Sequence, residues 1–396
     1  MKLKKSLLPF VLGVLVTLAI GMVLITTEHA VLISSIKYDR LLDMDKKYEK
    51  AEKIKEEILE EFYQEISEEE LEIGMYRGMF EATGDKYSRY FTEEELEAYH
   101  DSTNGNYVGI GVLSDVSEGD IHITRVFPES PAEKAGILAG DFIIEVDGVS
   151  IEDSGYEKLI DIMLGEEGTD IEVIVNRDEE IMVFNLQRGR VDIPFISSKN
   201  LDGIGYIHIY QFGTDVSKEF KDHLKSLQKE GIRGLILDVR DNPGGLVAES
   251  TDIADMLMKD GLIIYTLDNE DNRRTYKSDA SSIDIPVVCI ANEKSASASE
   301  ILIGALQDSE SAVIVGEQSF GKGIVQGITN LTDGTGYKIT YSQYFTPNDN
   351  VIHQVGVTPD YIVPFEGSIN ILDPNPEQDP QLDKAIEVME ELMLSK

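Results

Sequence analysis

Short apolar runs alternate with helical patterns between residues 205 and 315, and this alternation constrains the fold more than any other feature of the sequence. Residues 234–239 hold a continuous apolar run, which is typical of a strand buried on both faces. Residues 298–306 are nearly all apolar, which predicts a buried helix. Further strands are predicted at residues 205–210, 262–265, 287–290 and 312–315, a hairpin around Asp333-Gly334, and a last helix at residues 381–393. An α/β core, in which helices cover a sheet, is therefore expected.

The composition of the chain excludes some classes of partner. Its 396 residues are long for one domain and natural for two or three. With 35 basic and 74 acidic residues the net charge is −39, so phosphate backbones would be repelled and no nucleic-acid partner is expected. Cys289 is the single cysteine, which excludes an intrachain disulfide, and its apolar surroundings favour a buried structural thiol.

The N-terminus has the pattern of a membrane segment. Lys2, Lys4 and Lys5 precede an almost uncharged apolar run at residues 7–26, which is about the length needed to cross a bilayer. Lysines before such a run place the N-terminus in the cytoplasm and the rest of the chain outside. A cleaved signal peptide, with secretion of the protein, is the alternative, but residues 26–30 make a poor small-x-small cleavage site.

The next segment is charged and helical in pattern. Ile54, Ile58, Leu59 and Phe62 recur at helical spacing, and residues 93–99 predict a further short helix. This segment carries no residues that suggest chemistry. A packing or dimerisation arm is expected, so a homodimer is one possible assembly.

Residues 104–190 predict mostly short strands with one amphipathic helix at residues 156–164. The strands are expected at residues 109–113, 121–126, 142–146, 171–175 and 181–186. The Asp147-Gly148 pair is the signal of a tight hairpin. Residues 188–194 are then expected to be a connector.

This segment resembles a PDZ domain. The resemblance is carried by the motifs Ser130-Pro131-Ala132, Ala135-Gly136-Ile137, Gly140-Asp141 and Val146-Asp147-Gly148. It implies that a glycine-marked loop offers backbone N–H groups to the terminal carboxylate of a peptide, which then adds to the sheet as a strand. The matching residues are Val108, Gly109, Ile110, Gly111 and Val112, which without the flanking motifs would indicate only the start of a strand.

Several serines stand at the start of the predicted helix at residues 298–306. Ser297 and Glu300 fit a capping box, so capping is the default interpretation of Ser297 alone. A nucleophile at a helix N-terminus would also profit from free N–H groups and the positive end of the helix dipole. Ser295 and Ser299 are the rival hydroxyls.

Lys322 lies on a glycine turn after a predicted strand. A lysine can deprotonate a serine if its surroundings hold the amine neutral. The stretch from Gly316 to Gly323 nearly spells a phosphate-binding P-loop, but Gly323 lacks the hydroxyl that would hold Mg²⁺. A solvated loop lysine remains the plain alternative for Lys322. His353 is the one histidine that remains a rival base, and metal-ligand spacings such as H-E-x-x-H are absent from the sequence.

A glycine turn follows the buried strand at residues 234–239. Its sequence is Asn242-Pro243-Gly244-Gly245, and a simple turn is the usual structure for such a string. Its glycines also leave backbone N–H groups free to face a ligand. Together with the N–H of Ala298, Gly244 and Gly245 could form an oxyanion hole.

The motifs taken together resemble the carboxyl-terminal processing peptidases, or tail-specific proteases, which use a Ser-Lys pair. Besides the PDZ-like segment, the resemblance rests on residues 84–90, 237–245, 295–301, 321–326 and 356–360. It implies a crotonase/ClpP-like core, Ser297 as nucleophile, Lys322 as general base and Gln326 as its partner. It also implies that the PDZ domain recognises substrate C-termini and gates the active site. The sequence departs from the family pattern at Glu293-Lys294 and at Asp241, and neither change removes a catalytic group.

We therefore expect an α/β multidomain protein that acts as a serine endopeptidase on extracytoplasmic proteins with accessible C-termini. No metal or organic cofactor is required by this chemistry. A PDZ scaffold with a degenerate protease core is the alternative function. The expected parts are a membrane anchor at residues 1–27, a helical region at 28–103, a PDZ domain at 104–190, a peptidase core at 191–364 and a helical tail at 365–396.

Overall fold

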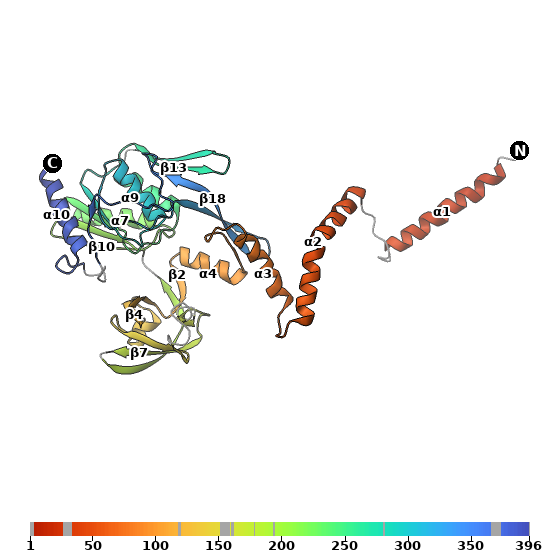
Figure 1. Ribbon diagram of the computed structural model, residues 1–396, viewed down its shortest axis with the longest axis horizontal. Coiled ribbons are helices and arrows are strands. Elements are labelled where there is room, and N and C mark those ends of the chain that lie inside the picture. The colour runs from red at the N-terminus through yellow and green to blue at the C-terminus, as the bar shows by residue number, and fades with distance from the viewer. Residues whose placement is uncertain are drawn as a thin grey trace. The chain divides into compact units, whose positions relative to one another are not determined.

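The computed structural model describes residues 4–26, 34–117, 120–150, 159, 162–177, 179–192, 195–279, 282–365 and 374–395 (Figure 1). The chain divides into two compact units, residues 1–79 and residues 80–396. The expected helix at residues 156–164 lies mostly outside the described residues.

The first unit is helical. It contains α1 (Lys4–Thr26), α2 (Ser35–Glu61) and most of α3 (Glu68–Glu81). Lys55 on α2 bonds to Glu68 on α3 at 2.5 Å, which joins the two helices. Within the described residues, none of these helices combines the length and the apolar character that crossing a membrane requires. The transmembrane helix expected at residues 1–27 is therefore not supported.

The segment that resembles a PDZ domain forms an antiparallel sheet around a core of its own. Its strand order is β3-β4-β5-β7-β8, with β6 paired to β5. The strands are β3 (Val112–Ser117), β4 (Asp120–Val126), β5 (Phe142–Val146), β6 (Val149–Ser150), β7 (Asp170–Arg177) and β8 (Glu180–Gln187). The short helix α5 (Pro131–Ala135) begins after Ser130 and ends at Gly136, whose φ of 88° favours glycine.

The strand expected at residues 109–113 is divided. Its first part belongs to β2 (Asn106–Gly109), which pairs with β9 (Gly189–Asp192), and its last part begins β3. The division falls at Gly111, which has a φ of 84° and lies so close to Ser130 that a Cβ would sit 2.2 Å from the serine Cβ. β9 also shows that the expected connector at residues 188–194 contains a strand.

The α/β core predicted from the apolar runs is confirmed. Its sheet has the order β10-β11-β12-β15-β16-β19, and every pairing is parallel except that of β10 with β11. The strands are β10 (Ile196–Leu201), β11 (Ile204–Ile209), β12 (Gly234–Asp238), β15 (Val287–Ala291), β16 (Val313–Gly316) and β19 (Tyr361–Ile362). β10 and β19 were not expected.

Helices cover both faces of this sheet. Side chains of α7 (Val216–Lys229), α8 (Val247–Leu257) and α9 (Ala298–Asp308) share one apolar cluster with one face of the strands. The C-terminal helix α10 (Pro380–Ser395) packs Leu382, Ala385 and Met389 on the other face. Because successive side chains of a strand point to opposite faces, this arrangement explains the unbroken apolar runs.

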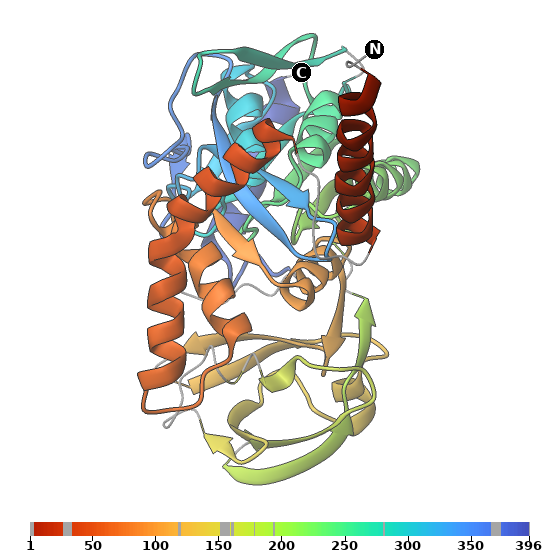
Figure 2. The same cartoon turned by 90° about the vertical axis from the view of Figure 1, so that its right-hand side faces the viewer.

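A second, antiparallel sheet lies beside α9. It contains β1 (Arg89–Phe91), β13 (Gly261–Asp268), β14 (Arg273–Ser278) and the hairpin of β17 (Ile324–Asn330) and β18 (Gly336–Phe345). The hairpin turns at Asp333-Gly334 as predicted. β1, which was not expected, pairs Arg89 with Lys338, and Figure 2 shows this orange strand beside the blue hairpin. Helix α4 (Glu93–Thr103) follows and confirms the short helix expected there.

Candidate active site

Ser297 stands immediately before α9 in an unusual backbone conformation. Its φ is 55° and its ψ is −111°, a combination that few residues other than glycine adopt and that is often found at functional sites. Its N–H donates to Glu300 Oε2 at 2.8 Å. Ser297 and Glu300 are arranged as the expected capping box, the Ser297 hydroxyl donates no hydrogen bond within the described residues, and the residue is 8% exposed.

The two rival serines use their hydroxyls for structural hydrogen bonds. Ser295 Oγ donates to the carbonyl of Val239 at 2.8 Å. Ser299 Oγ donates to the carbonyl of Asn242 at 3.0 Å. Both side chains are fully buried, so of the three hydroxyls only that of Ser297 donates no hydrogen bond within the described residues.

The buried Glu300 carboxylate joins the start of α9 to the loop that carries Lys322. Its Oε2 accepts the N–H groups of Ser297 and Lys322, each at 2.8 Å. Its Oε1 accepts the Ser319 hydroxyl at 2.7 Å and the Gly321 N–H at 2.6 Å. The sequence indicated only a capping role for Glu300, because a partner 22 residues away leaves no local pattern.

Lys322 is half-buried, and its Nζ lies 4.7 Å from the centre of the Tyr87 ring. Burial lowers the pKa of the Lys322 amine; the charges of Asp85 and Glu300 raise that pKa, and the charge of Lys86 lowers it. Among the described residues, its Nζ has no hydrogen bond to Ser297 Oγ. The Tyr87 segment was noted in the sequence as a motif, but its place beside Lys322 depends on the pairing of β1 with β18.

Tyr344 contacts the backbone of both Ser297 and Lys322. The Tyr344 hydroxyl, fully buried, lies 3.0 Å from the carbonyl oxygen of Ser297 and 2.9 Å from that of Lys322. It is a second residue that the sequence did not single out. Together with Glu300 it holds the two segments at a fixed separation.

Gln326 lies on β17, in register with Thr340 of β18. Its Nε2 donates to Thr340 Oγ1 and to the carbonyl of Ile324, both at 3.4 Å, which are long and therefore weak hydrogen bonds. The Thr340 N–H donates to Ser88 Oγ at 2.9 Å, and that hydroxyl donates to Asp85 at 2.6 Å. Gln326 is thus connected to the Asp85 segment rather than directly to Lys322.

The glycine turn lies against Ser297. A Cβ on Gly244 would sit 2.8 Å from Ser297 Cβ and 3.0 Å from the Ala298 nitrogen. The Gly244 N–H donates to Asn242 Oδ1 at 2.9 Å. Within the described residues the N–H groups of Gly245 and Ala298 have no partner. Two backbone donors are therefore free next to the contact between Gly244 and Ser297, one in each of the two segments.

The five residues expected to bind a peptide C-terminus belong to the segment that resembles a PDZ domain. Val108 and Gly109 are in β2, Val112 begins β3, and Ile110 and Gly111 lie between these strands. The carbonyls of Ile110 and Gly111 accept the N–H groups of Ala132 at 2.8 Å and Phe127 at 3.0 Å.

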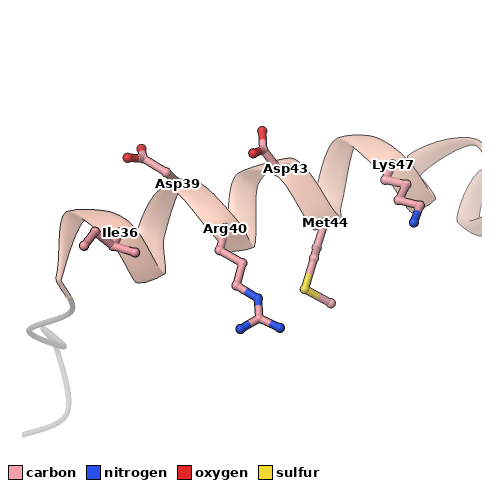
Figure 3. Close-up of a pocket in the computed structure, with 6 residues that line it drawn as sticks. All are labelled: Ile36, Asp39, Arg40, Asp43, Met44 and Lys47. Atoms are coloured by element: carbon pink, nitrogen blue, oxygen red, sulfur yellow. The ribbon is translucent and has the colours of Figure 1, made fainter.

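The backbone of His353 lies against the Lys322 loop, since a Cβ on Gly323 would sit 2.3 Å from the His353 backbone nitrogen. A separate pocket in the first unit runs along α2 and contains none of the candidate residues; Figure 3 shows its lining side chains, among them Ile36, Arg40 and Met44.

Comparisons with known proteins agree with this architecture. Residues 203–363 match the model of peptidase family S41, and residues 122–177 match that of a PDZ domain. A "Probable CtpA-like serine protease" of Staphylococcus haemolyticus (strain JCSC1435) is 33% identical over 287 residues, which cover 72% of this chain and 58% of that protein. The protein of the same description from Staphylococcus aureus (strain N315) is 32% identical over 301 residues, covering 74% and 61%.

The matched part of the chain thus spans about three fifths of the length of these relatives. Among solved structures, a photosystem II D1 C-terminal processing protease is similar with a TM-score of 0.54 and 29% identity, over 78% of this chain and 86% of that one. The match to the peptidase family includes the segments that carry Ser297 and Lys322. The chain therefore carries a peptidase family S41 domain at residues 203–363 and, ahead of it, a PDZ domain at residues 122–177.

Proposed function

We propose that this protein is a serine endopeptidase of the C-terminal processing type, with Ser297 as the nucleophile and Lys322 as the general base. The observation that carries the proposal is the Ser297 hydroxyl. It is the one hydroxyl of the three that donates no hydrogen bond, on a strained residue at a helix start, and the free N–H of Ala298 is next along the chain. Such an arrangement suits attack on a carbonyl carbon.

In the proposed reaction, neutral Lys322 takes the Ser297 proton while Oγ bonds to the peptide carbonyl carbon. The N–H groups of Gly245 and Ala298 stabilise the oxyanion, and Gly244 joins them if its N–H leaves Asn242. The Lys322 ammonium then gives the proton to the departing amine, and the C–N bond breaks. Water then attacks the acyl carbonyl carbon while Lys322 takes a proton from it. The bond from Ser297 Oγ to that carbon breaks, and Lys322 returns the proton to Oγ. Gln326 is proposed to orient the lysine.

Lys322 must turn from the Tyr87 ring toward Ser297 for this reaction. We assign this movement to substrate binding, with residues 108–112 of the PDZ domain holding the substrate C-terminus. A contact between the domains supports such gating, because the Arg125 guanidinium on β4 lies 4.8 Å from the ring of Tyr210, which follows β11. Protein or peptide substrates with accessible C-termini are therefore proposed.

A membrane location outside the cytoplasm is also proposed, from the lysines and the apolar run at the N-terminus. Apolar side chains on α1, such as Phe10, Leu12 and Leu15, are exposed, which suits contact with lipid. Fractionation of cells that express the full chain or a chain lacking residues 1–33 tests this location. Recovery of both proteins in the same soluble fraction would reject the anchor. A homodimer is a separate proposal, which light scattering on residues 34–396 tests.

The enzymatic proposal is tested with an unstructured protein as substrate, with candidate C-terminal peptides present. Ser297→Ala and Lys322→Ala are each expected to lower kcat by about 10⁴-fold or more, and Gln326→Ala by less. Ser299→Ala and Lys294→Ala are matched controls, because Ser299 is engaged and Lys294 is 64% exposed at its side chain. Undiminished cleavage by the first two variants would reject the Ser-Lys assignment, whereas an inactive wild type would favour a scaffold.

A further inference from the structure

Three cations lie around the proposed base Lys322, and all four side chains lie against aromatic rings. These cations are Lys86, Arg89 and Lys338, and together with Lys322 we call them the cation–aromatic cluster. Lys86 Nζ lies 5.1 Å from the Tyr87 ring, and Lys338 Nζ lies 5.3 Å from the Tyr99 ring. Arg89 Cζ lies 4.4 Å from the Phe91 ring.

Sheet register places Arg89 and Lys338 on the surface that carries Gln326. Arg89 is the cross-strand partner of Lys338, and directly paired residues point to the same face of a sheet. Thr340 follows Lys338 by two residues and pairs with Gln326, so it shares that face. Burial, and to a smaller extent the charges of Lys322 and Arg89, lower the pKa of Lys338 to about 8, while the charge of Asp85 raises it.

The cluster has little internal compensation. In the described part of the chain none of its four members forms an ion pair with a carboxylate. Asp85, whose charge raises the pKa of both Lys322 and Lys338, already accepts the Tyr87 N–H at 3.0 Å and the Ser88 hydroxyl at 2.6 Å. Cation–ring contacts are worth only about 0.5–1 kcal/mol at exposed sites, so they do not replace an anion.

This imbalance is unexpected in so acidic a chain. With 74 acidic residues against 35 basic ones, carboxylates are abundant elsewhere on the protein. Exposed Lys86 and Arg89, and half-buried Lys338, keep the cluster open to solvent. A group of cations that is left unpaired beside a proposed active site is suited to an anion supplied by the substrate.

We infer that the face beside Lys322 binds a carboxylate of the peptide substrate, with Lys338 and Arg89 as its cationic partners. The inference rests on the proposed peptidase function and adds a substrate preference to it. The carboxylate belongs either to an acidic side chain near the cleaved bond or to the free C-terminus of the substrate. Both sources offer the same chemistry, and the experiment separates them.

The test compares kcat/KM for matched peptides at low ionic strength. One pair differs only by Glu or Gln on the leaving side of the cleaved bond, and a second pair by a free or amidated C-terminus. The enzymes are the wild type, Lys338→Gln, Arg89→Gln and the control Lys277→Gln. Lys277 is an exposed lysine on β14 of the same sheet, outside the cluster.

The wild type and Lys277→Gln are expected to favour the carboxylate in at least one pair by about tenfold, as one charge-assisted hydrogen bond would provide. That ratio should fall toward one in Lys338→Gln and decrease in Arg89→Gln. Because it is a ratio within one enzyme preparation, partial misfolding of a variant does not affect it. The pair in which the ratio changes identifies the source of the carboxylate.

Two other results would overturn the inference. One is equal cleavage of both members of each pair by the wild type. The other is a carboxylate preference that survives unchanged in Lys338→Gln and Arg89→Gln, which would place its origin elsewhere, for example in the PDZ domain. Failure of the proposed function is distinguishable from both, because the wild type would then cleave none of the peptides.

Discussion

Glu300 and Lys322 are joined by a hydrogen bond of 2.8 Å from the Lys322 N–H to the buried Glu300 carboxylate. The same carboxylate oxygen accepts the Ser297 N–H. The backbones of the proposed nucleophile and the proposed base are therefore held by one acceptor. Their separation depends on this carboxylate, while the Lys322 side chain remains able to turn.

The first prediction concerns Glu300→Gln. An amide offers one acceptor oxygen where the carboxylate offers two, so two of the four N–H and O–H donors would face an NH₂ group. Burying two unpaired donors costs about 2–6 kcal/mol in the free energy of unfolding. A displacement on the order of 1 Å between Ser297 and Lys322 is expected to lower kcat about 10²-fold.

Urea unfolding and steady-state kinetics check both parts. Glu293→Gln is the matched control, since Glu293 is exposed on the same segment and its removal is expected to change stability by less than about 0.5 kcal/mol. Retention of wild-type stability and kcat in Glu300→Gln would show that the carboxylate does not hold the two segments.

The second prediction is a pair of opposite pH shifts. Lys322 must be neutral to accept a proton, and burial lowers its pKa, so kcat/KM should rise with pH and level off below the ordinary lysine pKa of 10.5. The charge of Asp85 raises the Lys322 pKa and that of Lys86 lowers it. Asp85→Asn should therefore move the rising limb to lower pH, and Lys86→Gln should move it to higher pH.

Stability follows the same linkage. Between the lowered pKa and 10.5 the unfolded chain binds the Lys322 proton and the folded chain does not, so the free energy of unfolding rises with pH there. Lys322→Met should remove this contribution and be more stable than the wild type at neutral pH. The measurements are pH–rate profiles and denaturation at several pH values; shifts of the same sign in Asp85→Asn and Lys86→Gln would contradict the assignment of the base.

Local patterns were sufficient to predict the parallel strands β11, β12, β15 and β16 and the helix that begins after Ser297. The residues of β12 and α9 are apolar because each element is buried within the core, and that burial is visible in the sequence itself. The choice among Ser295, Ser297 and Ser299 rested on motif resemblance. The structure adds a physical reason, because two of these hydroxyls are engaged.

Long-range pairings could not be predicted in the same way. β1 has three residues, too few for a periodic signal, yet its pairing with β18 places Tyr87 against Lys322 and Arg89 beside Lys338. Glu300 likewise meets Lys322 through the fold rather than through spacing. The fold class thus follows from local periodicity, whereas the surroundings of the base depend on contacts between distant segments.

The third prediction concerns the glycine turn. In Gly244→Ala the new methyl group would lie 2.7 Å from the carbonyl oxygen of Ala296 and 2.8 Å from Ser297 Cβ, at a φ of 103° that alanine avoids. The turn must shift away from Ser297, and kcat should fall by about 10²–10³-fold, as for loss of an oxyanion donor. Steady-state kinetics on a folded variant measures this loss.

Gly261→Ala is the control for this substitution. At the start of β13, its nearest atoms would be 3.8 Å away and its φ is ordinary, so kcat should stay at the wild-type value. Wild-type kcat in Gly244→Ala as well would separate the glycine turn from the chemistry.

The last prediction concerns the C-terminal segment, which is connected through Arg240 to the start of the glycine turn. Arg240 is fully buried and bonds to Asp238 at 2.5 Å and to Asp379 at 2.8 Å. Asp379 also accepts the N–H groups of Gln381 and Leu382, at 3.1 and 3.0 Å, and so caps α10. The C-terminal helix and the strand that leads into the glycine turn are thus connected through one buried ion network.

Removing one partner of a buried charge leaves the other uncompensated. Asp379→Ala should lower the free energy of unfolding by about 3–5 kcal/mol, and it should lower kcat because Arg240 directly precedes the turn at residues 241–245. Asp383→Ala, an exposed acid on the same helix, is expected to stay within about 0.5 kcal/mol of the wild type. Urea unfolding with parallel kinetics separates the two variants, and equal stability would mean that Asp238 alone compensates the Arg240 charge.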